Sequence, residues 1–182
     1  TSQRVTDVTL AAFGAAAPER VPAASQGTMN NLTIGGRDGS FAYYETIGGG
    51  FGGRAAKDGM DGVQVGMTNT LNTPIESLEA EYPLFVERYA FRPGSGGEGR
   101  FRGGLGLERT VRTEVEATVS LLTERRRFAP QGIDGGGPGA TGENLIDGEA
   151  VGAKTTVDVP ADTTITVRTP GGGGHGDPIE RD

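Results

Sequence analysis

The sequence predicts an α+β protein rich in β-strands, with an N-terminal helix, one short central helix and several antiparallel strands joined by Gly-rich loops. Three observations support this fold class: helical periodicity is confined to two short stretches, alternating runs of Thr, Val and Ile recur in the second half, and 33 of the 182 residues are Gly. Because Gly costs roughly 1 kcal/mol at each interior helix position, the composition excludes a helix bundle. The length suits a single domain or fragment over residues 1–182.

The first predicted helix covers residues 2–17. Its apolar residues recur at the spacing of one helix face and are Val5, Val8, Ala12, Phe13 and Ala16. Pro18 ends it. These apolar residues should therefore share one face of the helix.

The second predicted helix begins at the sequence Thr73-Pro74-Ile75-Glu76. This is a capping box, in which the Thr73 hydroxyl accepts from the amide of Glu76 and the Glu76 carboxylate accepts from the amide of Thr73. Pro83 limits the helix to two turns.

The remaining regular structure is predicted as strands. Phe85, Glu87, Tyr89 and Phe91 should share one side of a strand, because side chains alternate along it. Residues 107–115 and 117–123 indicate a pair of strands, as do 155–159 and 163–169. Glycine gathers between the strands at 48–53, 94–106, 132–142 and 171–176, which indicates tight corners.

The charge, the hydrophobic pattern and the cysteine content exclude several classes of partner and of chemistry. The net charge is −7, which argues against nucleic-acid binding because that needs a basic surface. There is no stretch of about 18 apolar residues for a membrane span and no Cys for thiolate catalysis or metal ligation. We expect a cytoplasmic protein without nucleic-acid or membrane partners.

Nucleotide and metal motifs are missing or weak. No phosphate-binding G-x-x-x-x-G-K-[ST] loop occurs, and none of the four G-x-G-x-x-G matches precedes a helical pattern. His175 is the only histidine, and we expect it at a loop tip. Because zinc takes three or four ligands, this chain alone predicts no metal site and no bound cofactor.

Glu45 and four asparagines are the candidate functional residues. Glu45 lies beside two tyrosines and a glycine run, where it could act as a general base or be a surface carboxylate. Asn30, Asn31, Asn69 and Asn72 are candidate ligand-binding residues. Asn69 and Asn72 precede a helix, so they could bind an anion or carbonyl oxygen, or form a hydrogen-bonded turn.

Arg125, Arg126 and Arg127 form a basic triplet at a predicted strand end. An anion site is one interpretation. Alternation along the strand should turn at least one of the three inward, where it would pair with a carboxylate.

Five strings together resemble one family. They are PAASQGTMNN at 22–31, YETIGGG at 44–50, MTNTLNTPIE at 67–76, SGGEGRFRGGLG at 95–106 and TPGGGGHGDP at 169–178. In this order they resemble the hydantoinase B/oxoprolinase family, especially the B subunit of N-methylhydantoinase. The match covers nearly the whole chain and corresponds to the C-terminal part of such a protein.

The resemblance implies part of an ATP-dependent hydrolase of cyclic amides such as hydantoins and 5-oxoproline. It implies a hetero-oligomer in which ATP and Mg²⁺ are bound by a hydantoinase A-like subunit, while any divalent metal lies in an upstream region outside this chain. The amide carbonyl would be phosphorylated and then attacked by water, so an oxyanion would need donors. Glu45 and Asn69 are then the candidate catalytic residues, and the candidate substrate-binding residues are Asn30, Asn31, Asn72, Gly49 and Gly50.

Two other functions remain open. Some relatives are components of ATP-dependent acetone or acetophenone carboxylases, which use a ketone and bicarbonate. The chain could also be a non-catalytic assembly module of such a complex.

Overall fold

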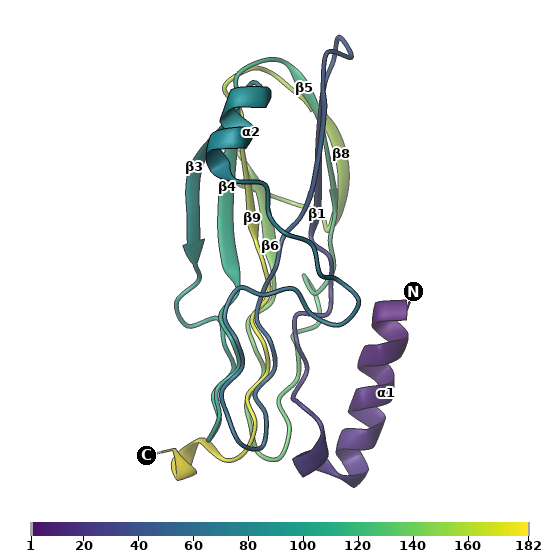
Figure 1. The fold of residues 1–182 in the computed structure, drawn as a ribbon, viewed down its shortest axis with the longest axis vertical. Helices are drawn as coiled ribbons and strands as arrows, with labels where there is room; N and C mark the ends of the chain where they lie inside the picture. Colours follow the sequence, from purple (N-terminus) through teal and green to yellow (C-terminus); the bar gives the residue numbers. More distant parts are fainter. Residues whose placement is uncertain (1, 182) are drawn as a thin grey trace.

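Two antiparallel sheets pack face to face in the upper half of the molecule (Figure 1). The structure is a computed structural model that describes residues 2–181. One sheet has the strand order β2-β1-β5-β8, with bounds Ala42–Thr46, Asn31–Gly36, Ala117–Leu122 and Lys154–Val159. The other has the order β3-β4-β9-β6-β7, with bounds Leu84–Phe91, Leu107–Thr113, Thr164–Arg168, Glu143–Ile146 and Glu149–Val151. The predicted α+β, β-rich class is confirmed.

The apolar core lies between the two sheets. Strand β4 alternates buried and half-buried residues along its whole length, and β5 does so up to its last residue. Val119 of the first sheet and Val111 and Ile165 of the second are fully buried in one cluster. The two-residue period of the sequence therefore marks these strands correctly.

The predicted pairing of neighbouring strands is wrong. Strand β4 pairs with β3 and β9, whereas β5 pairs with β1 and β8. The links at 114–116 and 160–163 each carry the chain from one sheet to the other. The second link bonds to the end of β4, where the amide of Asp162 donates to Thr113 O at 2.7 Å. Alternation identifies a strand but does not say which strand lies beside it.

A bulge changes the predicted faces of β3. The register shifts between Val86 and Arg88, so residues before and after the shift point to opposite sides. Tyr89 then pairs with buried Arg109, while the ring of Phe85 lies 5.2 Å from the guanidinium of Arg112. The four residues predicted on one side are therefore divided between both.

Helix α1, Ser2–Ala16, stands beside the lower half of the molecule (Figure 1). Its apolar stripe points outward: Val5, Val8 and Phe13 are 60–69% exposed. The buried residue is Gly14, which lies against Ile133 and Val21. The predicted helix is confirmed, and its apolar stripe is exposed within this chain.

Helix α2, Ile75–Glu81, lies beside β3 and buries Leu78 in the core. The helix is confirmed, but the predicted capping box is wrong. Pro74 is the N-cap and no side chain caps it. The amide of Thr73 donates instead to Glu45, a carboxylate distant in sequence, at 3.2 Å.

The lower half contains extended segments without regular sheet structure (Figure 1). The central one is 170–176, flanked by the 3₁₀ helix η2 at Pro178–Glu180. Four successive amides, at residues 171–174, donate to carbonyls of Ala140, Gly104, Ala24 and Gly137. The first and fourth amides reach the same segment, so the direction repeats every three residues, as in a polyproline II helix. We call these packed segments the glycine bundle: residues 23–26, 49–53, 95–104, 130–140 and 170–176.

Close backbone packing explains most of the glycines in this bundle. A Cβ on Gly172 would collide with Phe51 O, and one on Gly174 with Glu98 O. Only eight of the 33 glycines have a positive φ, so chain approach, not turning, is the main requirement. The interpretation of the clusters as tight corners is therefore corrected.

His175 belongs to this bundle. Its side chain is 3% exposed, and its Nε2 lies 3.0 Å from Pro18 O, in the 3₁₀ helix η1 at Pro18–Arg20. The expected loop-tip position is wrong, because His175 is buried and its backbone pairs with those of Phe101 and Ile133.

Candidate functional site

A buried ion pair lies between the sheets. Glu45 comes from β2 and Arg109 from β4, their Oε2 and Nε atoms are 3.2 Å apart, and both side chains are at most 3% exposed. The Arg109 guanidinium also lies 4.9 Å from the centre of the Tyr89 ring. Moving two charges out of water is costly, so a buried ion pair is stable only when its geometry allows a strong attraction between the partners.

Glu45 connects this pair to the segment before α2. Its Oε1 accepts from the amide of Thr73, and Tyr43 lies on the same face of β2. Burial and then the nearby Glu45 charge raise the pKa of Tyr43, so its hydroxyl stays protonated. The structure thus brings Glu45 next to the predicted 69–73 segment.

Several polar atoms around the ion pair have no hydrogen-bond partner within residues 2–181. They are Tyr43 Oη and Arg109 Nη1 and Nη2, and a further one, Asn72 Nδ2, lies on the segment that Glu45 contacts through the Thr73 amide. Buried polar groups are normally satisfied by protein or ordered water, so this cluster can hold water or a polar ligand group. Glu45, Arg109, Tyr43 and Asn72 are therefore the candidate site.

Sequence reasoning missed Arg109. The sequence contained a signal for it. Arg109 lies midway between Leu107 and Val111, and side chains two residues apart along a strand share one face, which here is the buried one. An arginine at a core position of a strand must have a buried partner, and that partner is Glu45.

Asn69 lies apart from the buried cluster. It is exposed, as are Thr70 and Leu71, the latter at 97%. Two hydrogen bonds attach this segment to the rest of the protein. One joins the hydroxyls of Thr70 and Thr46, and in the other the Met67 amide donates to Gln3 Oε1. Asn69 is free to reach a ligand on the surface, and its catalytic assignment stays a prediction.

The other predicted asparagines lie elsewhere. Asn30 is fully buried with φ 45° and bonds to Gln26, Ile47 O and Arg126. Asn31 is half-buried and accepts from the Tyr44 hydroxyl at 3.1 Å. These contacts suit a scaffold role, and substrate binding by either residue stays a prediction.

Gly49 and Gly50 are buried in the glycine bundle. Their amides donate to Val63 O and Pro170 O, each at 3.0 Å. Neither amide is thus free for a ligand in this conformation, and their substrate-binding assignment also stays a prediction.

The arginine triplet is divided between two roles. Arg125 lies 3.3 Å from the carboxylate of Asp7, which confirms the expected inward ion pair. Burial and then neighbouring Arg92 lower the pKa of Arg126 to about 9. Two asparagine oxygens, of Asn30 and Asn144, accept from its guanidinium.

Neither a metal centre nor a membrane span occurs in the described part of the chain. Across residues 2–181, no three His, Cys, Asp or Glu side chains gather closely enough to hold a metal ion. Within the same range, none of the helices has the length and apolar character needed to cross a bilayer.

Comparison with known proteins places the chain in a family. The family model described as Hydantoinase B/oxoprolinase matches residues 1–178. The chain is 46% identical to 5-oxoprolinase 1 of Arabidopsis thaliana, over 98% of this chain and 14% of that protein. It is 33% identical to a protein described as the B component of a D-/L-hydantoinase of Pseudomonas sp. strain NS671, over 98% of this chain and 31% of that protein. The chain thus spans a third or less of these relatives.

Two solved structures of ATP-dependent enzymes resemble this chain. The ATP-dependent caprolactamase of Pseudomonas jessenii has a TM-score of 0.73 and 26% identity, covering 93% of this chain and 32% of that chain. An acetone carboxylase has a TM-score of 0.66 at 19% identity, covering 93% and 28%, which shows a shared fold. The family model, which matches nearly the whole chain, shows that the chain belongs to the hydantoinase B/oxoprolinase family.

Proposed function

We propose that this chain is part of an ATP-dependent hydrolase that opens cyclic amides of the hydantoin or 5-oxoproline type. The observation that carries the proposal is the 46% identity to a 5-oxoprolinase over 98% of the chain. The likeness to a caprolactamase supports the same substrate class, because caprolactam is also a cyclic amide.

ATP and Mg²⁺ are assigned to a hydantoinase A-like partner. The sequence has no phosphate-binding loop of the G-x-x-x-x-G-K-[ST] type, and one relative is described as the B component of a hydantoinase with more than one kind of chain. The overall reaction would consume the lactam, ATP and two waters, and would release the amino acid, ADP and phosphate. Hydrolysis of the amide C–N bond accounts for one water, and hydrolysis of ATP accounts for the other.

The contribution of this chain would be a positioned polar segment. Glu45 fixes Thr73 by accepting from its amide, and Arg109 holds the Glu45 carboxylate. Asn69, exposed on that segment, could then donate to a developing oxyanion. Placement of one such donor contributes about 10²–10³-fold to kcat in other acyl-transfer enzymes.

The test is lactam-dependent ATP hydrolysis by the complete complex. Asn69→Asp keeps the side-chain shape but removes the donor N–H groups, and should lower kcat by about 10²-fold. Met67→Ala, on the same segment and 64% exposed, is the matched control and should retain activity. ATP hydrolysis that responds only to a ketone with bicarbonate would favour a carboxylase, and full activity of Asn69→Asp would favour an assembly role.

A further inference from the structure

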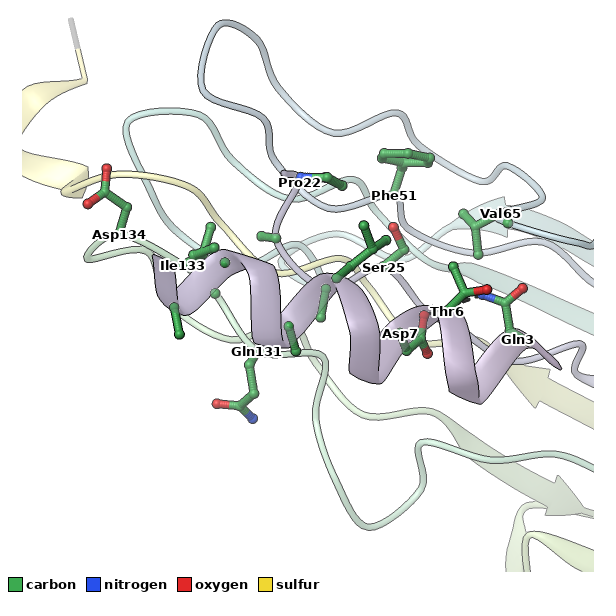
Figure 2. A pocket seen from close by; sticks show the side chains of 18 residues that line it. Gln3, Thr6, Asp7, Pro22, Ser25, Phe51, Val65, Gln131, Ile133 and Asp134 are labelled. Carbon is green, nitrogen blue, oxygen red and sulfur yellow. Dashed lines mark hydrogen bonds between the residues drawn. The ribbon is translucent and has the colours of Figure 1, made fainter. Parts of the chain in front are cut away.

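Helix α1 turns polar side chains toward the rest of the molecule. A cavity of about 520 Å³ lies between α1 and the glycine bundle, and Gln3, Thr6 and Asp7 line it from the helix, with Val65 also in its wall (Figure 2). Within Ser2–Ala16, Gly14 alone is buried, and it belongs to the second half of the helix. The first half of α1 is therefore held chiefly by polar contacts.

Gln3 makes two hydrogen bonds with its side-chain amide. Its Oε1 accepts from the Met67 amide at 3.0 Å, and its Nε2 donates to Asp7 Oδ1 at 3.3 Å. The two bonds use the acceptor and the donor of one side chain, so together they define its orientation. The two segments approach closely, since a Cβ on Gly66 would collide with the Gln3 side chain.

Asp7 attaches Gln3 to the rest of the protein. Its carboxylate lies 3.3 Å from the guanidinium of Arg125 and 3.2 Å from that of Arg4. A Cβ on Gly27 would collide with the same carboxylate. Gln3 is therefore a half-buried side chain whose position is determined by contacts with segments distant in sequence.

The bond from Gln3 reaches the turn that immediately precedes Asn69. In this turn the amide and the hydroxyl of Thr68 both donate to Val65 O, at 3.2 and 2.8 Å, and both residues are buried. On the other side of Asn69, the hydroxyl of Thr70 bonds to the last residue of β2. Asn69 is thus exposed between two attachment points, and Gln3 provides the first of them.

We propose that Gln3 is a positioning residue, which holds the turn before Asn69 so that the Asn69 side chain is directed at the substrate carbonyl. The proposal rests on the proposed function for the role of Asn69, and it adds α1 to the elements that form the site. A misplacement of about 1 Å can cost about 10²-fold in rate, so the attachment of such a segment affects turnover. The Met67 side chain is 64% exposed, and the contact uses its backbone amide.

Amide hydrogen exchange, followed by NMR, tests the contact without ATP, substrate or partner. Gln3→Met keeps the length of the side chain but removes the acceptor, so the Met67 amide should exchange about tenfold faster. Gln3→Glu keeps an acceptor and should retain the protection, since two arginines beside Asp7 offset the added charge. Thr6→Val is the matched control, because the Thr6 hydroxyl donates to Ser2 O within the helix. Unchanged exchange of the Met67 amide in Gln3→Met would overturn the proposal.

Turnover by the complete complex tests whether the contact acts through Asn69. Gln3→Met should lower kcat for lactam-dependent ATP hydrolysis about tenfold and leave KM unchanged, because an oxyanion forms only in the transition state. Gln3→Glu should restore most of this loss. In the Asn69→Asp background, Gln3→Met should cause no further loss, because the donor that it positions is already gone. Equal losses in both backgrounds would show a general structural role and overturn the proposal.

The outcomes also separate this proposal from the proposed function. Full turnover by Gln3→Met, together with a loss in Asn69→Asp, would refute the positioning role while the function stands. A complex without lactam-dependent ATP hydrolysis, in which the Met67 amide still responds to Gln3→Met, would refute the function while the attachment of the turn by Gln3 stands. Circular dichroism would confirm that each variant folds.

Discussion

Glu45 and Arg109 hold opposite charges in the buried space between two sheets. Burial strengthens the attraction between the two charges but removes their hydration. Removing one partner would therefore leave the other charge buried without compensation. Thr73 adds the hydrogen bond that ties a surface segment to the pair. At the scale of single residues, this makes Glu45 a structural link between core and surface segment.

Breaking this pair should be costly. Arg109→Met and Glu45→Gln should each lower the free energy of unfolding by about 3–5 kcal/mol, because each leaves a buried charge unpaired. The double variant should lose less than the sum of the two. Urea denaturation of all four proteins provides the measurement, and additive losses would contradict the coupling.

Two other carboxylates should respond to pH in opposite ways. Burial, the largest cause, raises the pKa of Asp7, whereas the hydrogen bond from Arg102 lowers the pKa of Asp61. A raised pKa means that the folded state binds the proton more tightly, so acid favours folding at Asp7. At Asp61 the unfolded state binds it more tightly, so acid opposes folding there.

The measurement is the stability difference between the unmodified protein and each Asn variant from pH 7 to pH 3. Against Asp7→Asn, the unmodified protein should gain relative stability as the pH falls through the folded pKa of Asp7. Against Asp61→Asn it should lose its advantage as the pH falls through the folded pKa of Asp61. Parallel curves for the two positions would be inconsistent with these environments.

At the scale of elements, α1 shows the difference between amphipathicity and burial. Its apolar stripe faces outward, while Gly14 and the polar Gln3 and Asp7 face the bundle. Gly14 lets the helix approach Ile133. The spacing predicts the helix because the period is intrinsic, but the side that packs depends on what the rest of the molecule offers.

Polar substitutions on the outer face of α1 should therefore be tolerated in this chain. Val8→Gln should change the free energy of unfolding by about 0.5 kcal/mol or less, since exposed sites rarely cost more. Leu10→Gln, on a half-buried residue that lines the cavity, is the comparison and should cost more. Thermal denaturation would show this, and a larger cost at Val8 would mean that its face is covered.

At the scale of the whole molecule, the glycine bundle connects five distant segments. Its backbone amides bond between segments in a three-residue repeat, and that packing leaves no room for most side chains. The bundle forms one wall of the cavity beneath α1. Close backbone packing therefore accounts for a glycine content that is by itself typical of disordered chains.

Two Gly→Ala variants test this packing. A Cβ on Gly174 would collide with Glu98 O, whereas one on Gly137 finds its nearest atom at 3.6 Å and φ is not positive there. Gly174→Ala should lower the melting temperature strongly or prevent folding, because backbone must move. Gly137→Ala should be neutral or stabilising by about 0.4–1 kcal/mol through the unfolded chain. Similar melting temperatures for both would argue against the bundle.

The sequence pattern did not identify strands β1, β2, β6 and β7. The two helices, the positions of the other five described strands, the family and the association of glycine with a special backbone could be predicted from the sequence. These follow from local periodicity, turn chemistry and matching strings, which the chain carries residue by residue. The folded molecule was needed to show that β4 and β5 belong to different sheets, and that Glu45, not Glu76, receives the Thr73 amide. It was also needed to show that Arg109 completes the buried cluster. Those outcomes depend on contacts between residues distant in sequence, and only packing selects one of the many partners that the same local pattern allows.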